Sequence, residues 1–242
     1  MDVTLYVVPG SHPSMAARLM LDHKGVAYRR VDLVPAMHKV LLRAMRFPGA
    51  TVPALRIDGE RVVGSKRIAR LLDERFPDRP LFPAEPSARE RVAAAEGWGE
   101  GVLQPVPRRL AWWVMRRDRS LASTFQQGAN LPVPAPVATA FLPFVAWAAS
   151  RFNGSTDSAV KADLGALPGL LDKVDELLAQ GVIGGPALNA ADFQIGTSVR
   201  LLAAFEDLME RVERRPAGGH ARRVVPDHPG RLPAAFPKAW IR

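Results

Sequence analysis

The stretch Thr51-Val52-Pro53-Ala54-Leu55-Arg56-Ile57-Asp58-Gly59-Glu60-Arg61-Val62-Val63-Gly64-Ser65 decides the fold. It predicts a strand over Ala54–Ile57, a tight Asp58-Gly59 turn, a returning strand over 61–63 and then a helix. Proline has no N–H to donate, so Pro53 suits the start of a strand and not its paired interior. The stretch is therefore expected to form a β-hairpin that leads directly into a helix.

The same stretch carries two devices for holding an extended peptide. A proline at the start of a strand often adopts the cis isomer, and Val52 would then turn its own N–H and C=O toward a peptide. Ser65 is expected to cap the following helix, and a helix N-terminus attracts a carboxylate. The two devices lie side by side and predict a peptide-binding corner.

Length and composition limit the class of protein. The chain has 242 residues, of which 48% are hydrophobic, enough for two domains with full cores. It contains no cysteine, which excludes disulfides, thiolate metal sites and a cysteine nucleophile. No basic segment precedes an apolar run, and no apolar run approaches about 18 residues. We therefore expect a cytoplasmic protein with no membrane span and no bound metal.

The net charge of +9 raises the question of nucleic-acid binding. Residues 84–210, however, carry 11 basic and 14 acidic side chains, and no nucleic-acid motif is present. We expect no nucleic-acid partner, and we interpret the charge as a basic surface that attracts anionic ligands.

The first part of the chain alternates strands and helices. Apolar patterning predicts strands over 3–8 and 27–33, a helix over 13–23 that ends at Gly25, and a helical segment near 40–45. The hairpin and a helix over 65–76 complete the order β-α-β-α-β-β-α, with the first two strands parallel. This is the element order of a thioredoxin-like domain, which we assign to residues 1–80.

The second part reads as all-helical. A proline-rich linker over 81–86 separates it from the first domain, and residues 87–242 are expected to form a helical bundle. Ser87 with Glu90 predicts a capping box, and Pro105 and Pro107 should kink or break a helix over 89–103. Further helices are expected over 137–152, along the leucine stripe at 170–178, and after an Asn189 cap with Asp192 in the capping-box position. The segment 128–136 reads as a loop, and the tail from Pro216 shows little periodicity.

Four short motifs, taken in order, resemble the glutathione S-transferase family. Val52-Pro53-Ala54-Leu55 matches its Val-Pro turn, and Leu188-Asn189-Ala190-Ala191-Asp192-Phe193 looks like its helix-capping S-x-A-D-F element. His38-Lys39 stands 14 residues before Val52, as a His/Lys pair does in the family. Ser11-His12-Pro13-Ser14 looks like the active-site loop of the serine-type cytosolic members. The resemblance extends from about Leu5 to Trp240 and implies a detoxifying transferase.

The resemblance implies that the reactive thiol comes from glutathione, which suits a chain without cysteine. Ser11 occupies the position of the catalytic hydroxyl, with Ser14 as second choice; both serines could instead serve only as helix caps. The tyrosine that other classes use would fall at Val7. Tyr6 is one residue away and points to the opposite face of its strand, so we interpret it as structural.

The resemblance also implies a set of residues that bind glutathione. Val52 and Pro53 would hold the peptide backbone, Ser65 the γ-glutamyl carboxylate, and the His38-Lys39 pair the glycyl carboxylate. Gly64 departs from the family, which usually has Glu or Gln before this serine, and the change removes one contact to the glutamyl group. The charges of Lys66 and Arg67 are close enough in sequence to compensate.

An electrophile pocket is expected between the two domains. Its candidate residues are Trp112, Trp113, Met115, Phe141 and Phe144, which could instead belong to the core. The resemblance implies a homodimer and a small-molecule electrophile as acceptor. Two other functions stay open: a non-catalytic ligand carrier on the same fold, and a transferase that uses a different low-molecular-weight thiol.

Overall fold

A mixed four-stranded sheet forms the centre of the first domain. The computed structural model describes residues 1–35, 37–126, 128–130, 135–228 and 230–241, and side chains for all of these except residues 119, 122, 123, 126 and 135–142. The strands are β1 (Val3–Val7), β2 (Arg29–Asp32), β3 (Ala54–Ile57) and β4 (Glu60–Val63), in the order β2-β1-β3-β4. β1 pairs parallel with β2 and antiparallel with β3, so the predicted parallel β-α-β unit is confirmed.

The predicted hairpin is confirmed. Ile57 pairs with Glu60, and the turn residues between them, Asp58 and Gly59, both have positive φ values of 47° and 94°. Two left-handed residues give the turn a twist that matches the flanking strands. The peptide bond between Val52 and Pro53 is cis, as the sequence predicts.

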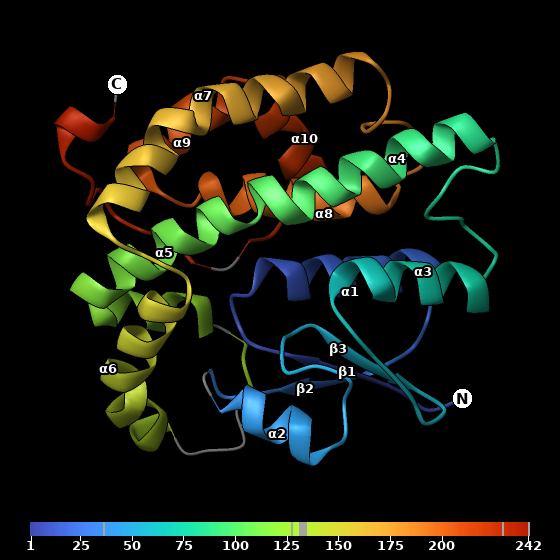
Figure 1. Ribbon diagram of the computed structural model, residues 1–242, viewed down its shortest axis with the longest axis horizontal. Coiled ribbons are helices and arrows are strands. Elements are labelled where there is room, and N and C mark those ends of the chain that lie inside the picture. The colour runs from blue at the N-terminus through green and yellow to red at the C-terminus, as the bar shows by residue number, and fades with distance from the viewer. Residues whose placement is uncertain (36, 127, 131–134, 229, 242) are drawn as a thin grey trace.

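Helices cover both faces of the sheet (Figure 1). α1 (His12–Lys24) and α3 (Ser65–Arg75) lie on the face toward the helical domain, and α2 (His38–Ala44) lies on the other. Alternation along β1 serves both faces: Leu5 packs in the main core, whereas Tyr6 packs in a smaller core under α2. The Tyr6 ring meets Phe47 edge-on at 5.3 Å, which confirms that this tyrosine is structural.

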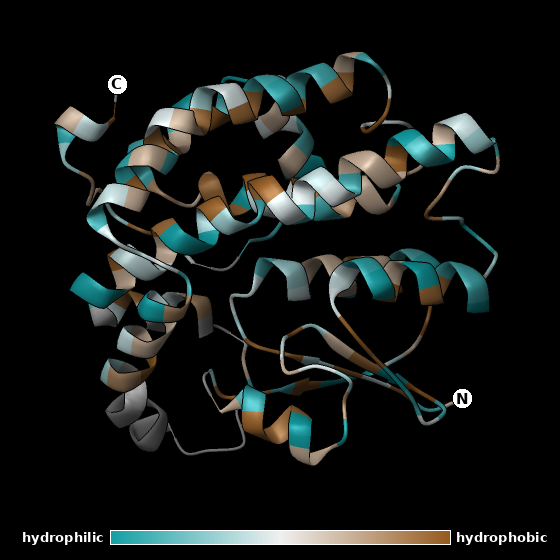
Figure 2. Ribbon diagram, in the orientation of Figure 1, coloured by the Kyte–Doolittle hydropathy of each residue, from teal (hydrophilic) through white to brown (hydrophobic). Residues whose placement is uncertain are grey.

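The second part of the chain is all-helical, as predicted. Its elements are α4 (Pro86–Trp98), a π-helical turn η1 (Gly99–Leu103), α5 (Pro105–Arg117), the 3₁₀ segment η2 (Arg119–Gln126), α6 (Ala135–Phe152), α7 (Asp157–Ala179), α8 (Ala190–Leu202), α9 (Glu206–Glu213), α10 (Pro216–Val224) and η3 (Lys238–Trp240). α8 is buried along nearly its whole length, between α1, α4 and α10. Figure 2 shows apolar and polar residues interspersed along these helices, and the apolar residues that are buried form the main core. None of the helices within the described residues is long and apolar enough to cross a bilayer.

The predicted cap of α8 is confirmed in detail. The Asn189 side chain accepts from the backbone N–H groups of Ala191 and Asp192, and the Asp192 carboxylate accepts from the N–H of Asn189. Asp192 also accepts from the N–H of Gly184 and is fully buried. The capping box therefore anchors the loop before α8 as well as the helix itself.

One local prediction was wrong, and the structure refines two others. α4 is capped by Glu85, whose carboxylate accepts from the N–H groups of Ser87 and Ala88, so Ser87 and Glu90 form no capping box. The helical path does not break before Pro105; it continues through η1, where a π turn takes up the change. The tail begins with a regular helix, because Pro216 sits at the first turn of α10, where its missing N–H costs nothing.

Candidate functional site

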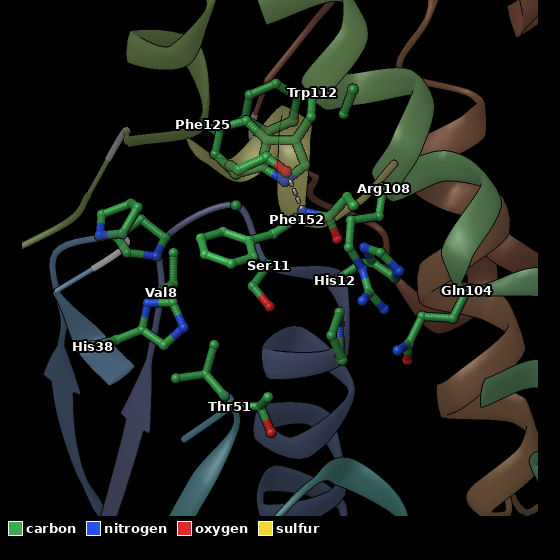
Figure 3. A pocket seen from close by; sticks show the side chains of 18 of the residues that line it. Val8, Ser11, His12, His38, Thr51, Gln104, Arg108, Trp112, Phe125 and Phe152 are labelled. Carbon is green, nitrogen blue, oxygen red and sulfur yellow. Dashed lines mark hydrogen bonds between the residues drawn. The ribbon is translucent and has the colours of Figure 1, made fainter. Parts of the chain in front are cut away.

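A cavity of about 450 Å³ opens between the first domain and the helices α5 and α6. The loop before α1, the start of α2, the Val52-Pro53 bend and the start of α3 line one side. Side chains from α5, η2 and α6 line the other. Figure 3 shows Ser11 at the end of α1, with His38 and Thr51 to one side of it and Arg108, His12 and Gln104 to the other.

Ser11 lines this cavity at the N-terminus of α1. Its hydroxyl oxygen caps the helix by accepting from the Ser14 N–H at 3.4 Å, and it accepts from the Ser14 hydroxyl at 3.0 Å. Both contacts use the oxygen as acceptor, so the Ser11 O–H proton is left to point into the cavity. Ser11 can therefore cap α1 and at the same time donate a hydrogen bond to a ligand in the cavity.

Ser14 occupies a different position. Its side chain is 2% exposed, lies outside the cavity lining and donates to Ser11. A hydroxyl in this place supports Ser11 from behind and has no direct path to a ligand.

The Val52-Pro53 bend forms the neighbouring wall. Both residues line the cavity, and the Pro53 carbonyl accepts from the Gly64 N–H at 2.8 Å. This bond fixes the bend against the start of α3, so the exposed backbone of Val52 and the α3 N-terminus face the same space.

The structure corrects the expectation that Ser65 caps α3. Gly64 is the N-cap residue, and Ser65 is the first helical residue. The Ser65 side chain is 2% exposed and its hydroxyl donates to Gln194 at 2.8 Å. Gln194 in turn donates to the side-chain oxygen of Gln104, so a buried polar chain joins α3, α8 and the start of α5. Ser65 thus ties the two domains together at the edge of the cavity.

Gly64 has φ 95° and ψ 137°, a backbone conformation that residues with a side chain rarely adopt. A Cβ built on it would meet no atom within 4 Å. A side chain at this position therefore has room but requires a strained backbone, which glycine avoids. The free N–H groups of the first turn of α3 remain the polar donors at this end of the cavity.

His38 and Lys39 both line the cavity at the start of α2. Burial, with a smaller effect from the Lys39 charge, lowers the pKa of His38 to about 4, so its imidazole is neutral at pH 7. The Lys39 ammonium lies 3.8 Å from the centre of the Phe152 ring, in a cation–π contact that joins α2 to α6. Lys39 is therefore the positive charge that this wall offers to a ligand.

The predicted acceptor-pocket residues separate into three groups. Trp112 and Met115 line the cavity. Trp113 lies on the other side of α5, where its indole N–H donates to Asp157 and its ring stacks on Phe236. Phe144 is 61% exposed and does not reach the cavity, whereas the side chain of Phe141 lies outside the described residues.

Several cavity residues were missed by sequence reasoning. These are His12, Gln104, Arg108, Phe125 and Phe152. One signal was present: Gln104 and Arg108 are four residues apart and so share a helix face. No sequence signal indicated Phe125, because the position of its ring depends on glycines that are distant in the chain. A Cβ on Gly10 or on Gly230 would come within 2.6 Å of the Phe125 side chain, so the ring is held where only glycines leave space.

The α5 side of the cavity carries the Arg108 guanidinium, and Glu100 from η1 also belongs to the cavity lining. Burial and the charge of Arg109 lower the pKa of Arg108, and burial with the Arg108 charge puts the pKa of His12 well below its ordinary value. His12 is therefore neutral, and its buried Nε2 has no hydrogen-bond partner among the described residues. Within the part of the chain that the structure describes, no three His, Cys, Asp or Glu side chains are grouped so as to hold a metal ion.

Comparison with known proteins finds sequence similarity in the first domain. Residues 5–80 match the sequence model described as "Glutathione S-transferase, N-terminal domain". A maleylacetoacetate isomerase from Rhizobium meliloti (strain 1021) is 38% identical over 95 residues, which are 38% of this chain and 45% of that protein. A probable maleylacetoacetate isomerase from Caenorhabditis elegans is 33% identical over 104 residues, 42% of this chain and 48% of that protein. The chain thus spans about half the length of the curated relatives it matches.

Solved structures match over nearly the whole chain. The beta-etherase LigF from Sphingobium sp. strain SYK-6 is 19% identical with a TM-score of 0.60, covering 92% of this chain and 99% of that one. A glutathione S-transferase from Sinorhizobium meliloti 1021 is 18% identical with a TM-score of 0.61, covering 94% of each chain. At sequence identities this low, the structural matches establish the fold and nothing beyond it. Residues 5–80 are similar in sequence to the N-terminal domain of glutathione S-transferases, and the chain as a whole has the two-domain fold of these solved structures.

Proposed function

We propose that this protein is a glutathione-dependent enzyme that ionises the thiol of glutathione beside Ser11 and directs it at an electrophile in the cavity. The observation that best supports this proposal is the direction of the hydrogen bonds at Ser11. Its oxygen accepts from Ser14, so its own proton is available to a sulfur in the cavity. The names of the curated relatives favour isomerisation of an unsaturated acid as one form of this chemistry.

The energy required is within reach of these groups. A free cysteinyl thiol has a pKa of about 8.5, so only about 3% is thiolate at pH 7. Lowering that pKa by ~2 units requires ~2.7 kcal/mol of preferential stabilisation of the thiolate. A hydroxyl donor to a charged group contributes ~1.5 kcal/mol or more, and the N-terminus of α1 adds up to ~1 kcal/mol. The positive charges of Lys39 and Arg108 act in the same direction.

The residues around Ser11 fit an extended anionic tripeptide. Val52 offers its backbone beside the cis bend, and the first turn of α3 offers free N–H groups for the γ-glutamyl carboxylate. Lys66 and Arg67 stand on that turn, and Lys39 faces the other end for the glycyl carboxylate. The Ser65 hydroxyl donates to Gln194, so its backbone N–H is the group left to contribute.

The proposed transfer balances simply. The thiol releases its proton to water, the thiolate sulfur forms a bond to the electrophilic carbon, and the leaving group departs with its bonding electrons. In an isomerisation, the sulfur adds to a conjugated carbon and is later eliminated, which returns the thiol. In both cases the chain's own part is to hold sulfur and acceptor together and to keep the sulfur ionised.

Gly64 supports a second candidate, a transferase that uses a different low-molecular-weight thiol. The absence of a Glu or Gln side chain removes a contact that glutathione has in related proteins, and a thiol without a glutamyl group would not need it. A carrier without catalysis is the third candidate.

We further propose a homodimer, which sedimentation analysis at several protein concentrations would test.

Conjugation of glutathione to a reactive aryl halide tests the proposal. We expect turnover at pH 7, and we expect Ser11→Ala to lower the rate at least tenfold, because about 1.4 kcal/mol of thiolate stabilisation is lost. Ser87→Ala, at an exposed position on α4, serves as the matched control and should keep full activity. Calorimetry with a panel of thiols separates the candidates.

Equal rates for Ser11→Ala and the unsubstituted protein would reject the role of Ser11. Binding of glutathione without turnover would favour the carrier. Activity with another thiol, and no binding of glutathione, would favour the second candidate.

A further inference from the structure

Arg108 lies on the α5 wall of the cavity without an acid partner. Among the described residues, none forms an ion pair or hydrogen bond with its guanidinium, and the carboxylate that influences it, Glu100, is not within ion-pair distance. The adjacent Arg109 behaves differently, because Asp163 holds it through two parallel hydrogen bonds. One turn of α5 thus carries one neutralised arginine and one that faces the cavity with its charge unbalanced.

Gln104 stands one helical turn before Arg108 and lines the same cavity. Its side-chain oxygen accepts from Gln194, at the end of the buried chain that begins at Ser65. The Gln104 amide nitrogen is therefore left as the donor toward the cavity. The guanidinium and this amide N–H therefore give one helix face two kinds of donor at the cavity, and the Glu100 carboxylate in the same lining forms no ion pair with Arg108 among the described residues.

His12 adds a buried polar atom without a hydrogen-bond partner to this corner. Its imidazole is 2% exposed, lines the cavity and has an unpartnered Nε2. Figure 3 shows His12 and Arg108 next to each other on the side of Ser11 that faces away from His38. Burial and the Arg108 charge both disfavour a proton on His12, so this ring leaves the arginine charge uncompensated. A partly buried charge without a partner is destabilising, and an anion bound here would relieve it.

We propose that Arg108 and Gln104 hold a carboxylate of the acceptor substrate, so that the electrophiles this protein prefers are organic acids. The inference rests on the proposed function, since it specifies what the thiolate attacks. The planar guanidinium fork matches a carboxylate in a way that an ammonium does not. Figure 3 shows Ser11 between this corner and His38, which precedes Lys39 in α2, so a sulfur at Ser11 would sit between the acceptor carboxylate and the glycyl carboxylate of glutathione.

The test uses two acceptors of similar shape, one anionic and one neutral: a chloronitrobenzoate and the matching chloronitrobenzamide. For each, kcat/KM is measured with the unsubstituted protein, with Arg108→Gln and with Arg116→Gln. Arg116 is exposed near the end of the same helix and outside the cavity, so it controls for loss of a positive charge from α5. Comparing the benzoate-to-benzamide ratio of kcat/KM between the proteins cancels the different intrinsic reactivities of the two acceptors.

We expect Arg108→Gln to lower the benzoate-to-benzamide ratio by roughly tenfold to a hundredfold, the effect of a charge-assisted hydrogen bond. Arg116→Gln should leave the ratio unchanged, and the KM for glutathione should not change in either variant. An unchanged ratio in Arg108→Gln would overturn the inference. So would a raised KM for glutathione with the ratio unchanged, because Arg108 would then serve the cosubstrate.

Calorimetric binding of the chloronitrobenzoate, without glutathione, separates this inference from the proposed function. Tighter binding to the unsubstituted protein than to Arg108→Gln, with no turnover of either acceptor, would keep the anion site and reject the enzyme. Turnover of the benzamide with equal benzoate binding to both proteins would keep the enzyme and reject the anion site. Thermal unfolding of each variant establishes that it is folded.

Discussion

At the scale of single residues, the site depends on two serines that have different tasks. Ser11 faces the cavity and Ser14 is buried behind it, with one hydroxyl donating to the other. A donor to the Ser11 oxygen polarises its O–H bond and fixes the direction of its proton. The pair thus forms a short relay that begins at the first turn of α1.

This relay predicts a graded effect of substitution. Ser14→Ala removes the supporting hydroxyl and leaves the Ser11 proton in place, so we expect the conjugation rate to fall by roughly twofold to tenfold, the effect of one neutral hydrogen bond. Initial rates at pH 7 measure this, with Ser87→Ala again as control. A loss from Ser14→Ala larger than from Ser11→Ala would reverse the assigned roles.

Prediction from the sequence succeeded for residues whose structure depends only on their neighbours in the chain. The Val52-Pro53 bend and the structural role of Tyr6 both follow from local rules, which the structure confirms. It failed at Ser65, because the partner of that hydroxyl, Gln194, lies 129 residues away in sequence. No local pattern indicates such a contact.

At the scale of elements, α8 shows how a helix end organises its surroundings. The Asn189 side chain caps the helix and also donates to the carbonyl of Val182, while Asp192 holds the N–H groups of Asn189 and Gly184. The preceding loop and the helix start are therefore one hydrogen-bonded unit. Because α8 contacts α1, this unit also supports the helix that carries Ser11.

We expect Asn189→Ala to reduce the free energy of unfolding by about 1–2 kcal/mol, the effect of losing a cap. Asn189→Ser keeps an oxygen that can accept from the same N–H groups, so it should cost clearly less. Urea unfolding of both variants measures the difference. Equal losses would mean that the bond to Val182, which neither variant keeps, is the important one.

Helix periodicity alone does not determine which of two adjacent residues faces the cavity. Trp112 and Trp113 are adjacent on α5, yet one lines the cavity and the other packs against Phe236. Successive helix residues point about 100° apart, so the sequence identifies an aromatic pair but not which member faces inward. That choice is made by α7 and the C-terminal segment, whose positions the sequence of α5 does not specify.

At the scale of the whole molecule, α3 and α4 meet where the buried Glu96 lies against the partly exposed Arg70. Glu96 is 1% exposed and its Oε2 lies 2.6 Å from Arg70 Nη1, although the two groups are not aligned for a hydrogen bond. Burial outweighs the arginine charge and raises the pKa of Glu96 to about 7. The junction between the two domains therefore contains a carboxyl that titrates near neutrality.

This group predicts a loss of stability with rising pH. In the folded protein Glu96 holds its proton up to about pH 7, whereas in the unfolded chain it loses it near 4.5. The folded state therefore binds more protons between these values, and the free energy of unfolding falls as pH rises through that window, by up to ~3 kcal/mol. Glu96→Gln does not titrate and should lack this fall.

Urea unfolding of both proteins from pH 4.5 to 7 measures the effect, and the difference between them removes contributions from other groups. His220 is one such group: its pKa is lowered to about 4, so its contribution is lost as pH falls and has the opposite sign. Parallel curves for the two proteins would show that Glu96 does not titrate as described.

The cavity itself is the part that the sequence predicts least well. Its lining comes from α1, α2, the hairpin, α5, η2 and α6, so its shape depends on how the two domains are packed. The first-domain residues Ser11, His38, Lys39, Val52 and Pro53 all line it, because one short motif or bend positions each of them. On the second domain, Trp112 and Met115 were predicted, whereas Arg108 and Phe125 became visible only in three dimensions.

The pKa of the glutathione thiol bound to the protein tests most directly whether Ser11 keeps the sulfur ionised. Ultraviolet absorbance of the thiolate, followed against pH with protein in excess, measures it for the unsubstituted protein, Ser11→Ala and Ser11→Thr. We predict a value ~2 units below the ~8.5 of the free thiol, a rise of about one unit in Ser11→Ala, and a value near the original in Ser11→Thr. The same pKa for the unsubstituted protein and Ser11→Ala, or a bound thiol that titrates like free glutathione, would contradict it.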